Sequence, residues 1–311
     1  IINSVFGMDI HPLAVIVSKT NYLLALGDLL IKRKGRISIP VYLSDAIRLP
    51  EKWMKTEGAD YQISIYNKIA YLPEKLLEDF TLYDKSIDAA REFAIQNIGK
   101  KSTESQFINF IKNQYPDLMS DTNIARALFH IAETLRDFIE QDQDTIWAFI
   151  LKNIYKPLFL KDKFDFVIGN PPWLSFRYAD PEYQKFLKEQ ITKNYKLLSG
   201  RGELITHLEL ATLFLLRTAD LYLKNNGTIS FVLPRSIFTA DQHDALRQGI
   251  FKGVNLIFRE IWDLEETKPL FNVPSCVLIA QKHPFTKVTY PIQGQKLSGK
   301  LENRNASLDE A

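Results

Sequence analysis

One stretch restricts the fold of this chain more than any other. Residues 164–173 read Phe-Asp-Phe-Val-Ile-Gly-Asn-Pro-Pro-Trp. The apolar, β-prone first half predicts a buried strand, and the two prolines end it abruptly. Asn170 then stands at the carboxyl end of a strand, which is where open α/β sheets bind ligands. The alternative is a plain strand-to-turn junction, in which the prolines only break the sheet.

The residues of this turn suit a planar amine. Asn170 offers a side-chain oxygen as an acceptor, and Pro171 offers a backbone carbonyl that Pro172 holds extended. Trp173 can stack on the face of a ring. Two acceptors on an exocyclic amine localise the lone pair of its nitrogen, which otherwise spreads into the ring. With an activated methyl donor, positioning would then dominate the reaction, and no strong general base is needed.

The turn resembles motif IV of the N6-adenine DNA methyltransferases, which use S-adenosylmethionine. Two earlier segments resemble motifs II and III of that family, in the family's order. Residues 4–12 contain a short apolar strand that ends in Asp9 and then a proline, Pro12, which begins a helix predicted at 12–30. The resemblance places Asp9 on the ribose of the donor and Ile10 against its adenine. A helix-capping role for Asp9 is the alternative.

Residues 37–47 are a second β-prone run, which ends in Ser-Asp-Ala. This run resembles motif III, and the resemblance assigns Asp45 and Ala46 to the adenine of the donor. Alone the signal is weak, because any strand can end in Asp. Its order between the other two motifs gives it value.

The chain after the turn resembles motifs V, VI and VIII. The sequence predicts a helix at 210–224, a stop at 225–227, a buried strand at 228–234, a helix at 235–246, and a closing strand pair at 256–264 and 275–281. In the family, motif VIII supplies a residue to the other face of the target base, and the spacing points to His243 or Phe238. A solvated position for His243 and core burial of Phe238 are the alternatives.

The motif order is that of the gamma class, in which a Gly-rich motif I precedes motif II. No Asp/Glu-x-x-x-Gly-x-Gly follows an apolar strand in this sequence. We therefore expect motif I to lie outside this chain, in a larger protein. The chain by itself should then bind the donor weakly, which makes its activity alone doubtful.

The spacing of the motifs predicts the domain organisation. Asp45 and Asn170 are 125 positions apart (170 − 45), where a bare fold needs one crossover helix. The predicted fold class is therefore α/β, a Rossmann-like S-adenosylmethionine-dependent methyltransferase sheet with a helical insertion. The predicted parts are the N-terminal part of the core at 1–50, the insertion at 51–160, the C-terminal part of the core at 161–290, and a polar, frayed tail at 291–311.

More detailed expectations follow from the same patterns. Within the insertion, helices are expected at 63–69, 84–98, 104–114, 121–139 and 145–160, with Asp121 and Thr122 as an N-cap. One mixed sheet should hold strands near Val5, Val41, Val167, Ile229, Ile257 and Val277. Asp9, Asp45 and Asn170 should meet at one edge of that sheet.

Composition excludes some classes of site. The single Cys276 excludes an internal disulfide, and one Cys with five scattered His residues gives no metal-ligand spacing. The net charge of +2 is too small to prove nucleic-acid binding. Residues 185–201 hold a candidate basic stretch for DNA, and a solvated loop is the alternative. We expect no apolar run to reach the length of a membrane span. We expect a cytoplasmic, prokaryotic protein with no membrane partner.

Three functions remain open. The resemblance implies methyl transfer from S-adenosylmethionine to the N6 amine of a flipped-out adenine in double-stranded DNA. It implies a restriction-modification or defence enzyme whose target-recognition region or subunit lies outside this chain. The second function is methylation of another planar amide or amine, as in the release-factor glutamine methyltransferases, which also carry Asn-Pro-Pro-aromatic; the long insertion and Trp173 favour DNA. The third is a non-catalytic module that keeps the fold.

Overall fold

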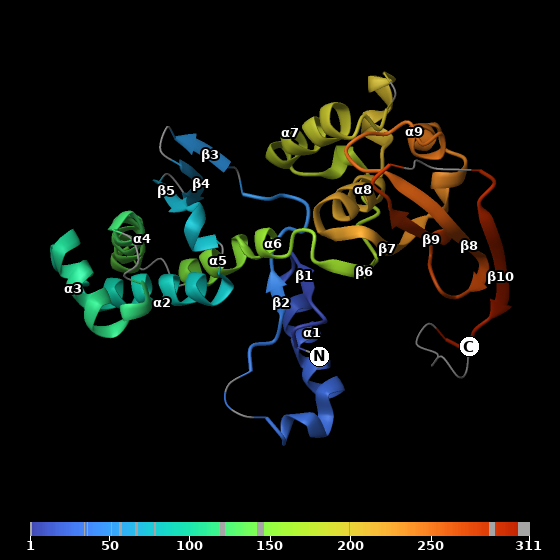
Figure 1. Cartoon of the computed structure of the whole chain (residues 1–311). Coiled ribbons are helices and arrows are strands. Elements are labelled where there is room, and N and C mark those ends of the chain that lie inside the picture. The colour runs from blue at the N-terminus through green and yellow to red at the C-terminus, as the bar shows by residue number, and fades with distance from the viewer. Residues whose placement is uncertain are drawn as a thin grey trace. The chain divides into compact units, whose positions relative to one another are not determined.

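The chain folds into two compact units, Ile1–Phe159 and Leu160–Ala311, in a computed structural model (Figure 1). The structure describes residues 2–33, 35, 37–50, 52–55, 58–65, 68–77, 79–118, 122–141, 146–198, 200–285 and 290–303. Both units contain helices and strands, so the chain is a mixed α/β protein, as predicted.

The first unit opens with two parallel strands joined by a helix. Its elements are β1 (Gly7–Asp9), α1 (Pro12–Leu26), a 3-10 turn (Gly27–Leu30) and β2 (Val41–Leu43). Asp9 pairs with Leu43, and α1 packs against both strands. Pro12 starts the helix, where its missing N–H costs nothing. Two predicted strands and the helix between them are thus confirmed.

The segment Pro12–Leu30 has the length and the apolar composition of a membrane-spanning helix. The expectation that no segment reaches a span was therefore wrong. A signal sequence and a core helix of a soluble protein can have the same length and apolar composition. Apolar side chains of α1, such as Leu13 and Leu24, are exposed.

A three-stranded antiparallel sheet opens the predicted insertion. It consists of β3 (Lys52–Lys55), β4 (Gly58–Ile65) and β5 (Lys68–Pro73), in the order β3-β4-β5. The helix predicted at 63–69 is therefore wrong, because the described residues of this range belong to the antiparallel strands β4 and β5. The run Tyr-Gln-Ile-Ser-Ile at 61–65 alternates apolar and polar residues, which is the period of a strand.

The rest of the insertion is helical, as predicted (Figure 1). The elements are a 3-10 turn (Glu74–Leu77), α2 (Phe80–Gln96), α3 (Glu104–Gln114), a 3-10 turn (Pro116–Leu118), α4 (Thr122–Glu140), α5 (Ile146–Ile154) and α6 (Lys156–Phe159). The helix predicted at 145–160 is divided into α5 and α6, and the predicted cap Asp121 lies outside the described residues. Asp79 caps α2, and Thr103 caps α3 through a capping box with Gln106.

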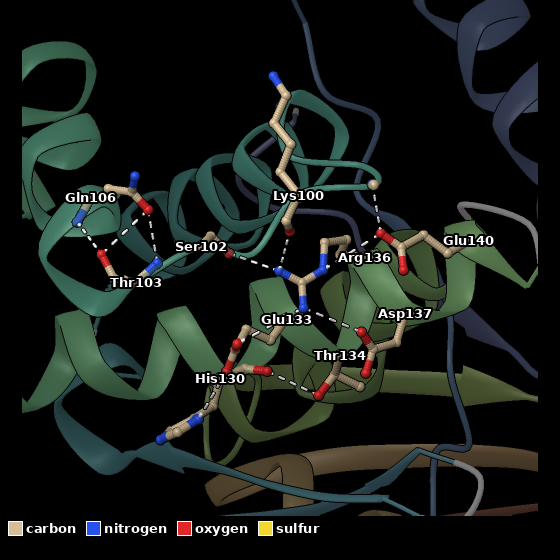
Figure 2. Close-up of polar contacts among 11 residues, drawn as sticks. Lys100, Ser102, Thr103, Gln106, His130, Glu133, Thr134, Arg136, Asp137 and Glu140 are labelled. Carbon is tan, nitrogen blue, oxygen red and sulfur yellow. Dashed lines mark hydrogen bonds and ion pairs between the residues drawn. The ribbon is translucent and has the colours of Figure 1, made fainter.

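Aromatic and aliphatic side chains of α2, α3 and α4 form one core. Phe93 and Phe107 meet edge-on with ring centroids 5.0 Å apart. At the surface of this core, Arg136 on α4 fastens the loop between α2 and α3 (Figure 2). Its guanidinium donates to the carbonyl of Lys100 at 3.3 Å and to Oγ of Ser102 at 2.8 Å. Three carboxylates of α4 surround the same guanidinium: Glu133, Asp137 and Glu140.

The second unit is built on a five-stranded mixed sheet (Figure 1). Its strands are β6 (Phe164–Gly169), β7 (Leu223–Pro234), β8 (Leu256–Lys268), β9 (Ser275–Lys282) and β10 (Gln293–Lys300), in the order β10-β8-β9-β7-β6. β6 runs parallel to β7, and β9 lies antiparallel between β7 and β8. The strands predicted in this part of the chain are confirmed.

Helices and turns complete the second unit. They are α7 (Pro181–Glu189), a π-helical turn (Gln190–Asn194), 3-10 turns (Phe176–Tyr178, Gly202–His207, Arg235–Phe238 and Asp241–His243), α8 (Leu210–Tyr222) and α9 (Asp244–Arg247). Most residues of α8 are buried, and it packs against β7 and β6.

Three local predictions for this unit are corrected. The single helix expected at 235–246 is instead two 3-10 turns and the short helix α9. The two 3-10 turns start separately, after Pro234 and after Ala240, so no continuous series of helical hydrogen bonds forms. The expected stop at 225–227 lies inside β7, where Asn226 has a φ of 67° and the pairing with β6 shifts. The tail expected to fray forms β10 up to Lys300, since its exposed polar side chains stay hydrated while its backbone pairs with β8.

The single predicted sheet is also corrected. β1 and β2 form a two-stranded sheet of their own, and β6 pairs only with β7 among the described residues. β6 is thus an edge strand, and Phe166 and Ile168 are 75% and 84% exposed rather than buried. The apolar sequence of β6 identified a strand correctly but gave no information about which strands flank it.

Candidate functional site

The Asn-Pro-Pro-Trp turn follows directly from the carboxyl end of β6. Asn170 and Pro172 are exposed, Pro171 is buried, and Trp173 is half-buried. The indole N–H of Trp173 donates to the carbonyl of Val232 on β7, at 3.3 Å. The side chain of Asn170 makes no hydrogen bond to any described residue. The turn therefore fixes the indole of Trp173 and leaves the side-chain amide of Asn170 exposed.

An aromatic partner of Trp173 comes from the connection between β8 and β9. The ring of Phe271 lies 5.4 Å from that of Trp173, centroid to centroid, at an interplanar angle of 45°. Sequence reasoning did not single out Phe271. The only available signal was an aromatic residue between prolines in a strand connection, Pro-Leu-Phe-Asn-Val-Pro at 269–274.

The two residues predicted to stack on a target base differ in their surroundings. Phe238 follows β7, is half-buried and has the guanidinium of Arg235 5.9 Å from its ring centroid. Arg235 itself is paired with Asp263 at 3.0 Å. His243 is 1% exposed, so its ring offers no open face, and a base-stacking role does not fit it. The alternative of a solvated His243 is equally excluded.

A buried polar network explains the position of His243. Its Nε2 lies 2.6 Å from Oε2 of Glu209, and its Nδ1 lies 2.9 Å from Oγ1 of Thr212. Glu209 also accepts from Oγ of Ser236 at 2.8 Å and from Nε2 of Gln242 at 3.1 Å. Burial alone would raise the pKa of Glu209. The hydrogen bonds and the charge of His243 outweigh burial and lower that pKa to about 2.

In the first unit, two carboxylates stand at neighbouring strand ends. Asp9 ends β1 and Asp45 follows β2, and the amide of Ser44 donates to the carbonyl of Asp9 at 3.0 Å. Because the strands are parallel, the two residues share one edge of the small sheet, as expected. Their convergence with Asn170, which belongs to the second unit, stays a prediction.

Each of these carboxylates accepts from backbone amides of a local turn. Oδ1 of Asp9 accepts from the amide of His11 at 2.7 Å, in a turn just before α1. The N-cap of α1 is His11, without a side-chain capping bond, so the structure does not give Asp9 the capping role that was the alternative. Oδ1 of Asp45 accepts from the amides of Ile47 and Arg48. The carboxylate of Asp9 is exposed, and Ile10 beside it is 70% exposed. An acceptor for hydroxyl groups beside an open apolar side chain fits the adenosine half of S-adenosylmethionine.

The segment predicted to be an insertion supports β2, the strand before Asp45. The amide of Leu43 on β2 donates to Oδ1 of Asn153 at 3.3 Å. Nζ of Lys156 lies 5.6 Å from the ring centroid of Tyr42 and 2.5 Å from Oδ1 of Asp84. Burial lowers the pKa of Lys156 to about 8, although Asp84 works against this. The insertion is thus part of the frame behind the predicted donor site.

A family model described as "Eco57I restriction-modification methylase" matches residues 3–271. The chain belongs to the Eco57I restriction-modification methylase family. The match to the Eco57I family runs from before β1 to the residue Phe271, so it includes Asp9, Asp45 and the Asn170 turn. None of the curated proteins matches the chain in sequence.

Some solved structures are weakly similar to parts of this chain. A DrdV–DNA complex is 18% identical, covering 48% of this chain and 16% of that one, with a TM-score of 0.34. A nuclease-deletion mutant of the Type ISP restriction-modification enzyme LlaGI, bound to a DNA substrate mimic, is 14% identical, covering 75% and 28%, with a TM-score of 0.37. A predicted O-methyltransferase from Agrobacterium tumefaciens is 13% identical, covering 59% and 70%, with a TM-score of 0.26. At these TM-scores the similarities do not establish a shared fold.

The match covers less than a third of the DrdV chain and of the LlaGI chain. In contrast, the Eco57I family match covers most of this chain and leaves out only its last part, which includes β9 and β10.

Proposed function

We propose that this chain is part of the catalytic core of an adenine-specific DNA methyltransferase. It transfers a methyl group from S-adenosylmethionine to the N6 amine of an adenine that is flipped out of double-stranded DNA. The observation that carries the proposal is the turn after β6, with an open Asn170 amide beside the paired rings of Trp173 and Phe271. Membership in a restriction-modification methylase family supports the same reaction.

The residues of the turn act mainly by positioning. Oδ1 of Asn170 and the carbonyl of Pro171 accept the two N–H groups of the target amine. Pro172 fixes the backbone that aims the carbonyl. Trp173 stacks on the adenine ring, which replaces the stacking lost in the duplex. The amine nitrogen then faces the donor with its lone pair localised.

Two aromatic residues are candidates for the other side of the base. Phe271 already touches Trp173, so a base stacked on the indole would take the place of that contact. Phe238 after β7 is the predicted candidate that remains. Both are half-buried and lie in loops at the carboxyl ends of strands, where α/β sheets bind ligands.

The donor site is assigned to the first unit. Asp9 accepts from the ribose hydroxyls, Ile10 packs on the adenine, and Asp45 with Ala46 contacts its amino edge. Bound S-adenosylmethionine supplies a sulfonium methyl group that needs no further activation. Target recognition belongs to a region or subunit beyond this chain, and the enzyme acts in the cytoplasm, where the DNA is.

The test is methyl transfer by the full-length protein that contains this chain, supplied with DNA and with protein acceptors in the same assay. Asn170→Ala should lower DNA methylation by about a hundredfold or more, since misplacing a reacting group costs that much. Binding of the donor should not change. Asn113→Ala, an exposed asparagine of α3, is the matched control.

Two results would count against the proposal. Labelling of protein alone would replace DNA with a protein amide as substrate. Full activity of Asn170→Ala on DNA would show that the turn does not orient the amine.

A further inference from the structure

Glu209 links two segments of the proposed active site. It precedes α8 as the N-cap, yet its side chain makes no capping hydrogen bond to that helix. Instead the carboxylate faces Ser236, Gln242 and His243, all in the chain that follows β7. A capping side chain would accept from the first amides of α8, so the carboxylate of Glu209 does not act as a helix cap.

The backbone at Glu209 is joined to the chain that follows Trp173. The amide of Leu210 donates to the carbonyl of Leu174 at 2.8 Å, and the amide of Phe176 donates to the carbonyl of Leu208 at 2.9 Å. Between these bonds, Ser175 and Glu209 form an isolated antiparallel bridge. This short ladder begins one residue after Trp173, so it fixes the carboxyl end of the Asn170 turn.

The side chain and the backbone of Glu209 therefore hold different segments. The backbone holds the chain after β6, which carries Asn170 and Trp173. The carboxylate holds the chain after β7 through Ser236, two residues before Phe238. His243 completes the node, because Thr212 on α8 binds its other ring nitrogen at 2.9 Å.

We infer that Glu209 is a positioning residue that sets the distance between the Asn170–Trp173 turn and the Ser236–Phe238 segment. This inference rests on the proposed function, in which the turn contacts the target adenine and Phe238 is a candidate for the other face of the base. Removal of the carboxylate would leave three side-chain donors without their acceptor in a half-buried site. The segment after β7 would then move relative to the turn, and small displacements of reacting groups lower rates strongly.

The experiment compares Glu209→Ala, Glu209→Gln and Ser236→Ala with Glu203→Ala, an exposed glutamate in the turn before α8. Each variant of the full-length protein is assayed for kcat and for the KM of donor and DNA. The second readout is ¹⁹F NMR with 5-fluorotryptophan, in which Trp173→Phe assigns the Trp173 resonance. This readout does not require activity.

For Glu209→Ala we expect kcat to fall at least tenfold, with the KM for the donor within about twofold of wild type. The Trp173 resonance should shift while those of Trp53, Trp147 and Trp262 stay. Glu209→Gln should be intermediate, because its amide oxygen still accepts from Ser236 but its NH₂ group cannot accept from His243. Glu203→Ala should match wild type.

Three outcomes overturn the inference: an unchanged kcat in folded Glu209→Ala, an unmoved Trp173 resonance, or a parallel loss of donor binding. If Glu209→Ala does not fold, wild-type kcat in both Glu209→Gln and Ser236→Ala overturns it. If the wild-type enzyme does not methylate DNA, the proposed function fails, and the Trp173 resonance still decides whether Glu209 holds the turn.

Discussion

At the scale of single residues, the sequence can point to a candidate site made of consecutive residues, but it does not reveal contacts that only folding creates. Asn170 to Trp173 were identified as a candidate site because their acceptors and ring stand in one rigid turn. The sequence did not predict that Phe271 contacts Trp173, since only the packing of the β8–β9 connection brings the two rings together. His243 was misjudged for the same reason. Its partners Glu209 and Thr212 lie on the preceding helix and its cap.

The contact between Phe271 and Trp173 leads to a prediction for the DNA reaction. Phe271→Ala should lower kcat/KM for DNA about tenfold or more, because stacking an aromatic ring on a base contributes about 1–3 kcal/mol. Phe271→Tyr should keep most of the activity, since a ring face remains. Phe285→Ala, at a side chain that is 88% exposed, is the control.

Methylation kinetics on one duplex check this prediction. Fluorescence of 2-aminopurine at the target position reports separately on base flipping. Wild-type kinetics in Phe271→Ala would remove Phe271 from the site and leave Phe238 as the residue opposite Trp173.

At the scale of elements, periodic patterns predicted whether a segment is a helix or a strand better than they predicted where it begins and ends. The helices α3 and α4 agree with their predicted ranges because amphipathic runs and polar caps mark them locally. The hairpin β4–β5 was missed although its alternation was visible, since a short apolar run fits a helix or a strand. β10 was missed because an edge strand with polar side chains has no apolar pattern at all. Its pairing with β8 is a property of the backbone.

The support of β2 by the insertion can be tested through Lys156. The folded chain holds the pKa of this lysine at about 8, below its ordinary value of 10.5. Between these two values the unfolded chain binds more protons than the folded one, so the free energy of unfolding should rise with pH. Lys156→Met lacks this proton and should not show the rise. Burial raises the pKa of Tyr42 to about 12, which lowers stability only at pH values near and above its ordinary pKa.

Urea unfolding at about pH 7.5 and about pH 9 measures the effect, because it compares one protein with itself as a single group loses its proton. Lys85→Met, which removes an exposed lysine paired with Asp117, is the control and should keep the wild-type rise. An equal rise in Lys156→Met would mean that Lys156 is not the titrating group.

At the scale of the whole molecule, the sequence predicted the strands but not their assembly. All the regions expected to be strands of the core contain one, yet β1 and β2 pair with each other and β6 stands at the edge of another sheet. The apolar pattern of β6 signals that its faces favour burial. It cannot signal burial itself, which depends on what lies beside the strand. The Asp9 and Asp45 strand ends came together as expected because they belong to one parallel pair.

The edge of β6 opposite β7, which pairs with no other described strand, leads to the last prediction. An edge strand that exposes Phe166 and Ile168 presents backbone groups and apolar surface together, a combination that promotes edge-to-edge association. The chain expressed by itself should therefore self-associate as its concentration rises. Phe166→Lys with Ile168→Lys should suppress this association without loss of the fold, because both side chains are exposed and charged residues on an edge strand oppose pairing. Phe285→Lys, which adds a charge at an exposed site away from the named strands, should associate like wild type. Sedimentation velocity across a concentration series distinguishes these cases, with circular dichroism to confirm the fold. If the double variant associates like wild type, the surface that mediates association is not the edge of β6. The exposed apolar side chains of α1 would then be the next to substitute.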